Sequence, residues 1–177
     1  MMIRLVIGNP GSGKSKIAED IVCGMDLKRY YIATMKVCDE EGKKRVLKHK
    51  KNREGKGFIT LEIPYKIADA KDKITDGDRS VILIECMSNL IGNEIYDDDR
   101  TAKLCKPSKE AASSIERLIM DDIRILSENV KETVIVSNEF DFDGNDEMTR
   151  FYVDITDMIN AGLSELADEV IDVRKNF

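Results

Sequence analysis

Short apolar runs alternate with stretches of helical character along the whole chain. The runs predict strands; they lie at 3–7, 30–33, 58–63, 80–84, 133–136 and 169–173. The stretches between them predict helices, most clearly where apolar residues recur every three to four positions; they lie at 14–25, 40–51, 65–73, 87–95, 108–130 and 148–166. Polar connections are expected at 97–107 and 141–146.

This alternation predicts an α/β fold with a doubly wound, mostly parallel sheet and helices on both faces. The runs at 80–84 and 133–136 are apolar after their first residue and are typical of strands that are buried on both sides. A chain of 177 residues is long enough for one core, and no boundary between domains is visible, so residues 1–177 are expected to form a single domain. Ligands of such sheets bind at the carboxyl ends of the strands.

A glycine-rich segment follows the first predicted strand and fits the pattern G-x-x-x-x-G-K-[S/T]. A strand before it and a helix after it are the context that distinguishes a phosphate-binding loop from a chance match, and they predict a P-loop NTPase-like domain. The loop consists of Gly8, Asn9, Pro10, Gly11, Ser12, Gly13, Lys14 and Ser15. We expect its amides to surround phosphate oxygens, Lys14 to reach the β- and γ-phosphates, and Ser15 to hold Mg²⁺.

The magnesium ion of such a site needs a carboxylate, which usually follows a buried strand next to the first one. Glu85 comes directly after the run at 81–84 and is the first candidate for this metal ligand and catalytic role. Glu139, after the run at 133–136, is the second candidate and could instead fix the loop geometry. The alternative for Glu85 is a strand-terminal side chain that faces solvent.

Composition narrows the possible functions. With 28 Lys and Arg against 34 Asp and Glu, the net charge is −6, which argues against general nucleic-acid binding. A single histidine excludes a histidine-rich metal site, and the four cysteines form no C-x-x-C pair, so free thiols are expected, several of them buried. No apolar run approaches the ~20 residues that span a membrane. No signal-peptide pattern precedes the first strand, and a cytoplasmic location is expected.

The only histidine, His49, lies in a basic segment at 43–53. On a helix, Arg45, His49 and Arg53 share one face, and Val46 and Leu47 would point toward the body. One interpretation is a solvated basic face on which the histidine is incidental. The other is a nucleophile that attacks phosphorus and forms a phosphoramidate, while the flanking cations hold the nucleotide phosphates.

The motifs together resemble the bifunctional adenosylcobinamide kinase / adenosylcobinamide-phosphate guanylyltransferase family of cobalamin synthesis. The most diagnostic segment is Arg45-x-x-x-His49-Lys50-x-x-Arg53. The other shared segments are the loop at 8–15, Tyr31-Ile32-Ala33-Thr34 with Asp39-Glu40 after it, Phe58-x-Thr60-x-Glu62, Ile84-Glu85-Cys86, Ser137-Asn138-Glu139, Arg150-Phe151, Asp154, Asn160, and Ala167-Asp168-Glu169-Val170.

The resemblance implies two reactions: phosphorylation of adenosylcobinamide by ATP or GTP, and transfer of GMP from GTP to the resulting phosphate. His49 matches the histidine that carries GMP, and Mg²⁺, a corrinoid substrate and a homo-oligomer are implied as well. The residues that match nucleotide contacts are those of the loop at 8–15 together with Met35, Lys36, Val37, Lys50, Lys51, Asn52, Arg53, Glu62 and Glu85.

This sequence departs from the family at 140–146, where a Gly-rich segment of the family is replaced by Phe140-Asp141-Phe142-Asp143-Gly144-Asn145-Asp146, and at Gly11, where an Arg is usual. Two alternatives therefore stand beside the family function. One is a P-loop kinase for another small hydroxylated metabolite, with His49 on the surface. The other is a GTP-binding module with impaired catalysis.

Overall fold

The computed structural model describes residues 1–37, 40–96, 106–140 and 146–173, with the backbone alone at positions 41, 45 and 48. Its centre is a six-stranded sheet in which every neighbouring pair is parallel. The strands, in spatial order, are β3 (Phe58–Glu62), β2 (Lys28–Ala33), β4 (Ser80–Glu85), β5 (Glu132–Asn138), β1 (Met2–Gly8) and β6 (Glu169–Asp172). The predicted parallel α/β fold is confirmed.

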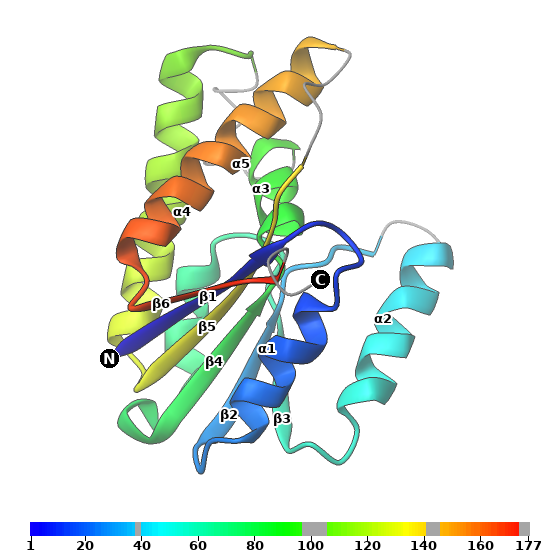
Figure 1. The fold of residues 1–177 in the computed structure, drawn as a ribbon, viewed down its shortest axis with the longest axis vertical. Coiled ribbons are helices and arrows are strands. Elements are labelled where there is room, and N and C mark those ends of the chain that lie inside the picture. The colour runs from blue at the N-terminus through cyan, green and yellow to red at the C-terminus, as the bar shows by residue number, and fades with distance from the viewer. Residues whose placement is uncertain (38–39, 97–105, 141–145, 174–177) are drawn as a thin grey trace.

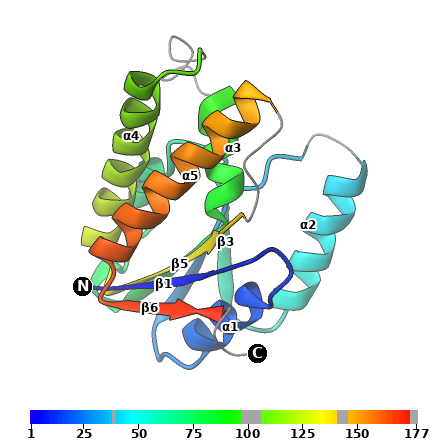
Figure 2. The same cartoon turned by 45° about the horizontal axis from the view of Figure 1, so that its top comes forward.

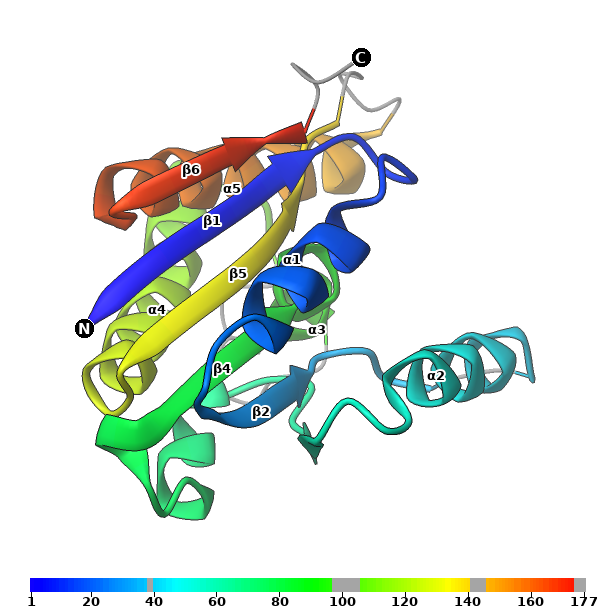
Figure 3. The ribbon, with the colours of Figure 1, turned by 60° about the horizontal axis from the view of Figure 1, so that its bottom comes forward.

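Helices cover both faces of this sheet (Figures 1 and 3). The helices are α1 (Lys14–Cys23), α2 (Glu40–Arg53), α3 (Met87–Tyr96), α4 (Lys109–Glu128) and α5 (Glu147–Leu166). Figure 3 shows α1 in front of the sheet and α3, α4 and α5 behind it, while α2 lies beyond the edge formed by β2 and β3. The larger apolar core joins the sheet to α3, α4 and α5, and a smaller one joins it to α1.

Local sequence explains where the longer helices begin. Ser108 accepts a hydrogen bond from the Ala111 amide at 3.0 Å, and Asp146 accepts one from the Thr149 amide at 2.9 Å, so each caps the helix that follows it. The helix predicted at 65–73 is a short 3-10 helix at Ile67–Lys73 instead. Lys66 before it has a φ of 52°, outside the α-helical region, so the helix cannot begin earlier.

The strand order corrects one prediction about Glu85. Its strand, β4, is not next to β1, because β5 pairs with both of them and lies between them. β4 is buried along its whole length, as predicted, and so is most of β5. Because the two runs have the same apolar signature, the sequence pattern could not tell which of them would pair with β1.

The register of the sheet aligns the carboxyl ends of its central strands. Gly8 at the end of β1 is paired with Asn138 of β5, and Ala33 at the end of β2 is paired with Glu85 and, on its other side, with Glu62. Figure 2 shows the loop after β1 and helix α2 at the same end of the sheet. Polar residues that are far apart in the sequence therefore meet along one edge.

Three further predictions concern the cysteines, the polar connections and membrane-spanning segments. Cys23 and Cys86 are free thiols, each partly buried rather than fully so, while Cys38 and Cys105 fall outside the described residues. The connection predicted at 97–107 and the polar loop at 141–146 lie mostly outside them as well. None of the described helices has the length and apolar character needed to cross a membrane.

Candidate functional site

The loop between β1 and α1 depends on glycine for its path. Gly11 and Gly13 have φ angles of 80° and 87°, in the left-handed region that residues with a Cβ rarely adopt. The Ser12 amide donates back to the Asn9 carbonyl at 3.2 Å, and α1 begins directly at Lys14. The start of α1 therefore lies at the loop, where the first amides of a helix and its dipole favour an anion.

Lys14 is held across this loop. It is 5% exposed, and its Nζ donates to the Asn9 carbonyl at 2.5 Å and to Ser12 Oγ at 3.4 Å. Burial lowers the pKa of Lys14, and the nearby Cys86, Glu85 and Glu139 oppose that effect. A bound phosphate would add negative charge beside the buried ammonium, so the site favours an anionic ligand.

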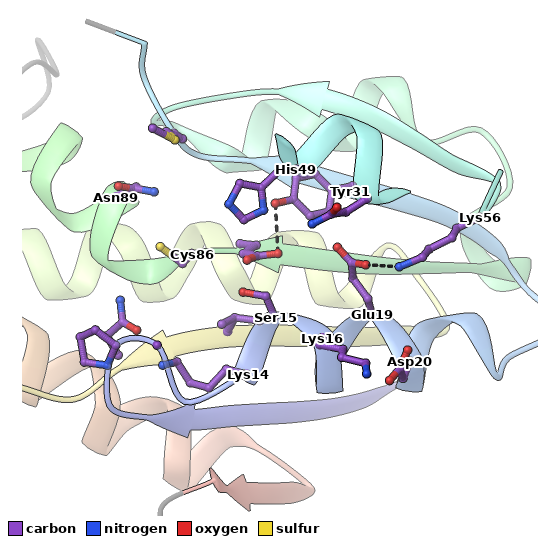
Figure 4. Close-up of a pocket in the computed structure, with 18 residues that line it drawn as sticks. Lys14, Ser15, Lys16, Glu19, Asp20, Tyr31, His49, Lys56, Cys86 and Asn89 are labelled. Carbon is purple, nitrogen blue, oxygen red and sulfur yellow. Dashed lines mark hydrogen bonds and ion pairs between the residues drawn. The ribbon is translucent and has the colours of Figure 1, made fainter. Parts of the chain in front are cut away.

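A cleft of about 810 Å³ opens between the loop, α1, α2 and the start of α3 (Figure 4). Ser15 and His49 both face it, from opposite walls. The predicted site residues that line this cleft are Pro10, Gly11, Gly13, Lys14, Ser15, Met35, His49, Asn52 and Glu85. The structure therefore brings the phosphate loop and the only histidine of the chain into one space.

Other predicted nucleotide contacts lie outside this cleft. Val37, Lys50, Arg53 and Glu62 line a much smaller space beside it, of about 60 Å³, which His49, Met35 and Glu85 also line. Lys50 and Glu62 form an ion pair there, with Nζ 2.6 Å from Oε1. The remaining predicted residues, Gly8, Asn9, Ser12, Lys36 and Lys51, line neither space.

Helix α2 presents one face to these spaces. Val46, His49 and Arg53 line the smaller one, and their spacing of three and four residues puts them on one side of a helix. Leu47 is 66% exposed, so the prediction that it points toward the body is wrong. One residue further along a helix turns the side chain by about 100°, which carries Leu47 away from the face of Val46. The Arg45 side chain lies outside the described residues.

Glu85 is buried at the end of β4 and is 8% exposed, so it does not simply face solvent. Its Oε2 accepts a hydrogen bond from the Tyr31 hydroxyl at 3.1 Å (Figure 4). Burial raises the pKa of Tyr31, and the neighbouring Glu85 carboxylate raises it further. Tyr31 therefore stays protonated and continues to donate to Glu85, which fixes this carboxylate at the cleft.

The residues present suit a magnesium ion that is shared with a nucleotide. Among the described residues, no group of three or more His, Cys, Asp or Glu side chains could hold a metal ion by itself. Mg²⁺ in nucleotide sites takes only one or two protein oxygens, and phosphates and water supply the others. Ser15 and Glu85 offer such oxygens on the same cleft. Glu139 does not line this cleft, although its backbone amide donates a hydrogen bond to the Gly8 carbonyl at 3.0 Å.

Two asparagines at the cleft were not among the predicted site residues. Asn138 ends β5 as Glu85 ends β4, so the reasoning that selected Glu85 could also have selected it. Its side-chain amide donates to Ser88 Oγ. Asn89 lies in the first turn of α3 and carries no motif that would have marked it.

Comparison with known proteins gives a consistent result over nearly the whole chain. The family model "Cobinamide kinase / cobinamide phosphate guanyltransferase" (CobU) matches residues 4–175. The "Bifunctional adenosylcobalamin biosynthesis protein CobU" of Salmonella typhimurium is 28% identical, over 96% of this chain and 93% of its own. Its Escherichia coli namesake is 26% identical over the same shares. "Bifunctional adenosylcobalamin biosynthesis protein CobP" of Pseudomonas aeruginosa is 26% identical over 94% and 89%.

Proposed function

The chain belongs to the cobinamide kinase / cobinamide phosphate guanyltransferase family, and we propose that both reactions of this family take place in the cleft between the phosphate loop and α2. The resemblance inferred from the sequence motifs is thereby confirmed at the level of the family. The substrates are a nucleoside triphosphate, GTP or ATP, and a corrinoid, adenosylcobinamide. The homo-oligomer, the cytoplasmic location and the single domain expected from the sequence stay predictions.

One observation carries the proposal: the phosphate loop and His49 of the same chain line one cleft. A nucleotide whose β- and γ-phosphates lie at the loop extends its α-phosphate and nucleoside away from Lys14. In this arrangement the α-phosphate extends toward the opposite wall of the cleft, where the His49 imidazole is placed to act as the nucleophile (Figure 4). A kinase alone would need the loop but not the imidazole.

In the kinase step the loop and Lys14 hold the triphosphate. The aminopropanol hydroxyl of adenosylcobinamide attacks the γ-phosphorus, the bond to the β-phosphate oxygen breaks, and the nucleoside diphosphate leaves. The hydroxyl proton passes to water. Lys14 stabilises the negative charge that develops on the transferred group and on the leaving oxygen. His49 takes no part in this step.

In the guanylyl step a neutral ring nitrogen of His49 attacks the α-phosphorus of GTP. The bond to the β-phosphate oxygen breaks, pyrophosphate leaves, and GMP stays bound to the imidazole as a phosphoramidate. A phosphate oxygen of adenosylcobinamide phosphate then attacks the same phosphorus and releases the imidazole, which gives adenosylcobinamide-GDP. The imidazole thus replaces a direct displacement between two anions, GTP and adenosylcobinamide phosphate, by two successive displacements at the same phosphorus.

Arg53 supports a nucleotide contact at the smaller space. It is 7% exposed, and within the described part of the chain its Nε and Nη1 have no hydrogen-bond partner. Buried guanidinium donors rarely stay unused. Because Arg53 lines the space shared with His49 and Glu62, a ligand oxygen there would satisfy these donors.

Ser15 and Glu85 are the residues that would hold Mg²⁺. When bound, the ion neutralises phosphate charge and orients the phosphate groups. The Ser15 hydroxyl stands in the first turn of α1, beside the phosphate site, and the Tyr31 hydroxyl fixes the Glu85 carboxylate.

We expect Glu85→Gln to raise the Mg²⁺ concentration that gives half-maximal kinase turnover by about 10- to 100-fold, because loss of a metal-orienting carboxylate weakens metal affinity by that factor. Turnover is measured across a magnesium titration at saturating ATP. Glu110→Gln, an exposed change on α4, is the control and leaves the titration unchanged. An unaltered magnesium requirement in Glu85→Gln would remove Glu85 from this role.

The proposed function is tested by intact-protein mass spectrometry after incubation with GTP. We expect the mass of the protein to rise by that of one guanylyl group, and to return to the starting value when adenosylcobinamide phosphate is added. The same incubation with ATP serves as the comparison for nucleotide preference. A protein that phosphorylates adenosylcobinamide but never gains this mass would leave the kinase alternative in place of the bifunctional one.

A further inference from the structure

We propose that Glu19 is a positioning residue for guanylyl transfer, because it fixes the C-terminal end of α2, and thus His49, against the helix that follows the phosphate loop. The inference rests on the proposed function. Glu19 lies on α1, four residues after Ser15, so both side chains share one face of that helix. It belongs to no motif that was used to assign the site.

Two cations from the end of α2 converge on this one carboxylate. Glu19 is 5% exposed, and its Oε2 accepts a hydrogen bond from Lys56 Nζ at 2.6 Å (Figure 4). Its Oε1 lies 3.9 Å from Nη1 of Arg53, an ion pair without a hydrogen bond. Arg53 is the last residue of α2 and Lys56 is in the turn after it. The buried Glu19 carboxylate on α1 therefore contacts both the last residue of α2 and the turn that follows the helix.

The same contacts continue into the sheet. The Arg53 guanidinium lies over the Tyr31 ring, with Cζ 3.5 Å from the ring centroid. The Tyr31 hydroxyl in turn donates to Glu85 at the end of β4. Arg53 and His49 are four residues apart on α2, which puts them on one face. An Arg53 that is fixed between Glu19 and Tyr31 therefore also sets the direction in which His49 points.

Helix α2 needs such polar contacts because it has little apolar surface. Val46 and Leu47 are the only large apolar residues in its 14, and Leu47 faces solvent. Hydrophobic burial stabilises contacts roughly in proportion to the apolar area removed from water, so it contributes little to the attachment of α2. The turn after the helix contains Gly55 and Gly57 at φ angles of 78° and 74°. The Glu19 contacts join this turn and the helix end to the middle of α1. Arg29 adds a second link, because it donates to the Lys56 carbonyl at 2.8 Å and to the Cys23 carbonyl, at the end of α1, at 3.0 Å.

Loss of the Glu19 contacts should therefore affect guanylyl transfer but not phosphoryl transfer. Phosphoryl transfer uses Lys14 and Ser15, whose places are set by the loop and the first turn of α1, whereas guanylyl transfer also needs His49 at the α-phosphorus. Loss of the Glu19 charge loosens the C-terminal end of α2 but leaves the phosphate loop in place. The two partial reactions of one protein thus report separately on whether Glu19 acts through His49 or through the phosphate loop.

The test compares wild type with Glu19→Gln in the full chain. We expect formation of the GMP adduct to slow by about 10- to 100-fold, since a displacement near 1 Å of a reacting group costs up to that factor, while kinase turnover stays within about threefold. We also expect hydrogen exchange of the amides at 49–56 to become at least about tenfold faster, with β1 and β4 unchanged. Asp121→Asn, which breaks an exposed ion pair on α4, changes none of these values.

A double-mutant cycle with Lys56→Gln identifies the partner. Lys56→Gln is expected to slow adduct formation less than Glu19→Gln, because it leaves the ion pair of Glu19 with Arg53. The double change is expected to slow it no further than Glu19→Gln alone, because the Lys56 contact is already lost in that variant. Equal losses of kinase and adduct rates in Glu19→Gln, or unchanged exchange at 49–56, would overturn the positioning role. If the wild-type protein forms no adduct, the proposed function fails, while the exchange measurement still decides whether Glu19 holds α2.

Discussion

His49→Ala will abolish the covalent GMP adduct, with a fall in the rate of guanylyl transfer of about 1,000-fold or more, because the nucleophile itself is removed. Kinase turnover will persist, since the imidazole is not used in that step. The adduct is followed with GTP labelled in its α-phosphate, after denaturation of the protein. A phosphoramidate is recognised by its loss in acid and its survival in base.

The matched control for this change is Leu47→Ala on the same helix. Leu47 is 66% exposed and does not line the cleft, so its truncation is expected to leave both rates unchanged. An adduct of the same acid lability that persists in His49→Ala would show that another residue carries the GMP. Kinase activity that disappears together with the adduct would instead indicate that His49 has a general structural part in the cleft.

Lys14→Met is expected to depress both reactions, by about 100- to 1,000-fold each, since both place the β-phosphate of the nucleotide at the loop and one lost charge-stabilising donor costs that factor. This pattern differs from that of His49→Ala, in which only one reaction is lost. The two rates are measured in the same preparation, with ATP for the kinase step and labelled GTP for the adduct.

The stability of Lys14→Met distinguishes lost catalysis from lost folding. Burial lowers the pKa of Lys14, so the folded chain disfavours the charged amine relative to the unfolded chain. At neutral pH that amine is charged when unfolded, so its presence opposes folding, and its removal should leave the free energy of unfolding in urea unchanged or higher. Lys28→Met, at the opposite end of β2, is the control and keeps both activities. A marked loss of stability in Lys14→Met would contradict this account.

The features that the sequence predicted well are those that depend on residues close together in the chain. The phosphate loop is eight consecutive residues, and Gly11 and Gly13 take the positive φ angles that such a turn requires. The central strand β4 was recognised because its interior, Val81 to Ile84, is buried on both faces and entirely apolar. His49 could be singled out because the basic segment around it matches a family pattern, although nothing local shows what lies across the cleft from it.

The sequence by itself therefore determined the fold class, the phosphate loop and the candidate nucleophile, since each is encoded by local spacing and composition. Only the tertiary structure decided that β5 lies between β1 and β4, that Leu47 faces solvent, and that Glu19 meets Arg53 and Lys56. Strand order, the inward face of a short polar helix and the pairing of distant charges depend on how separate elements pack against one another. Residue pattern within one element carries no information about the partner that this packing supplies.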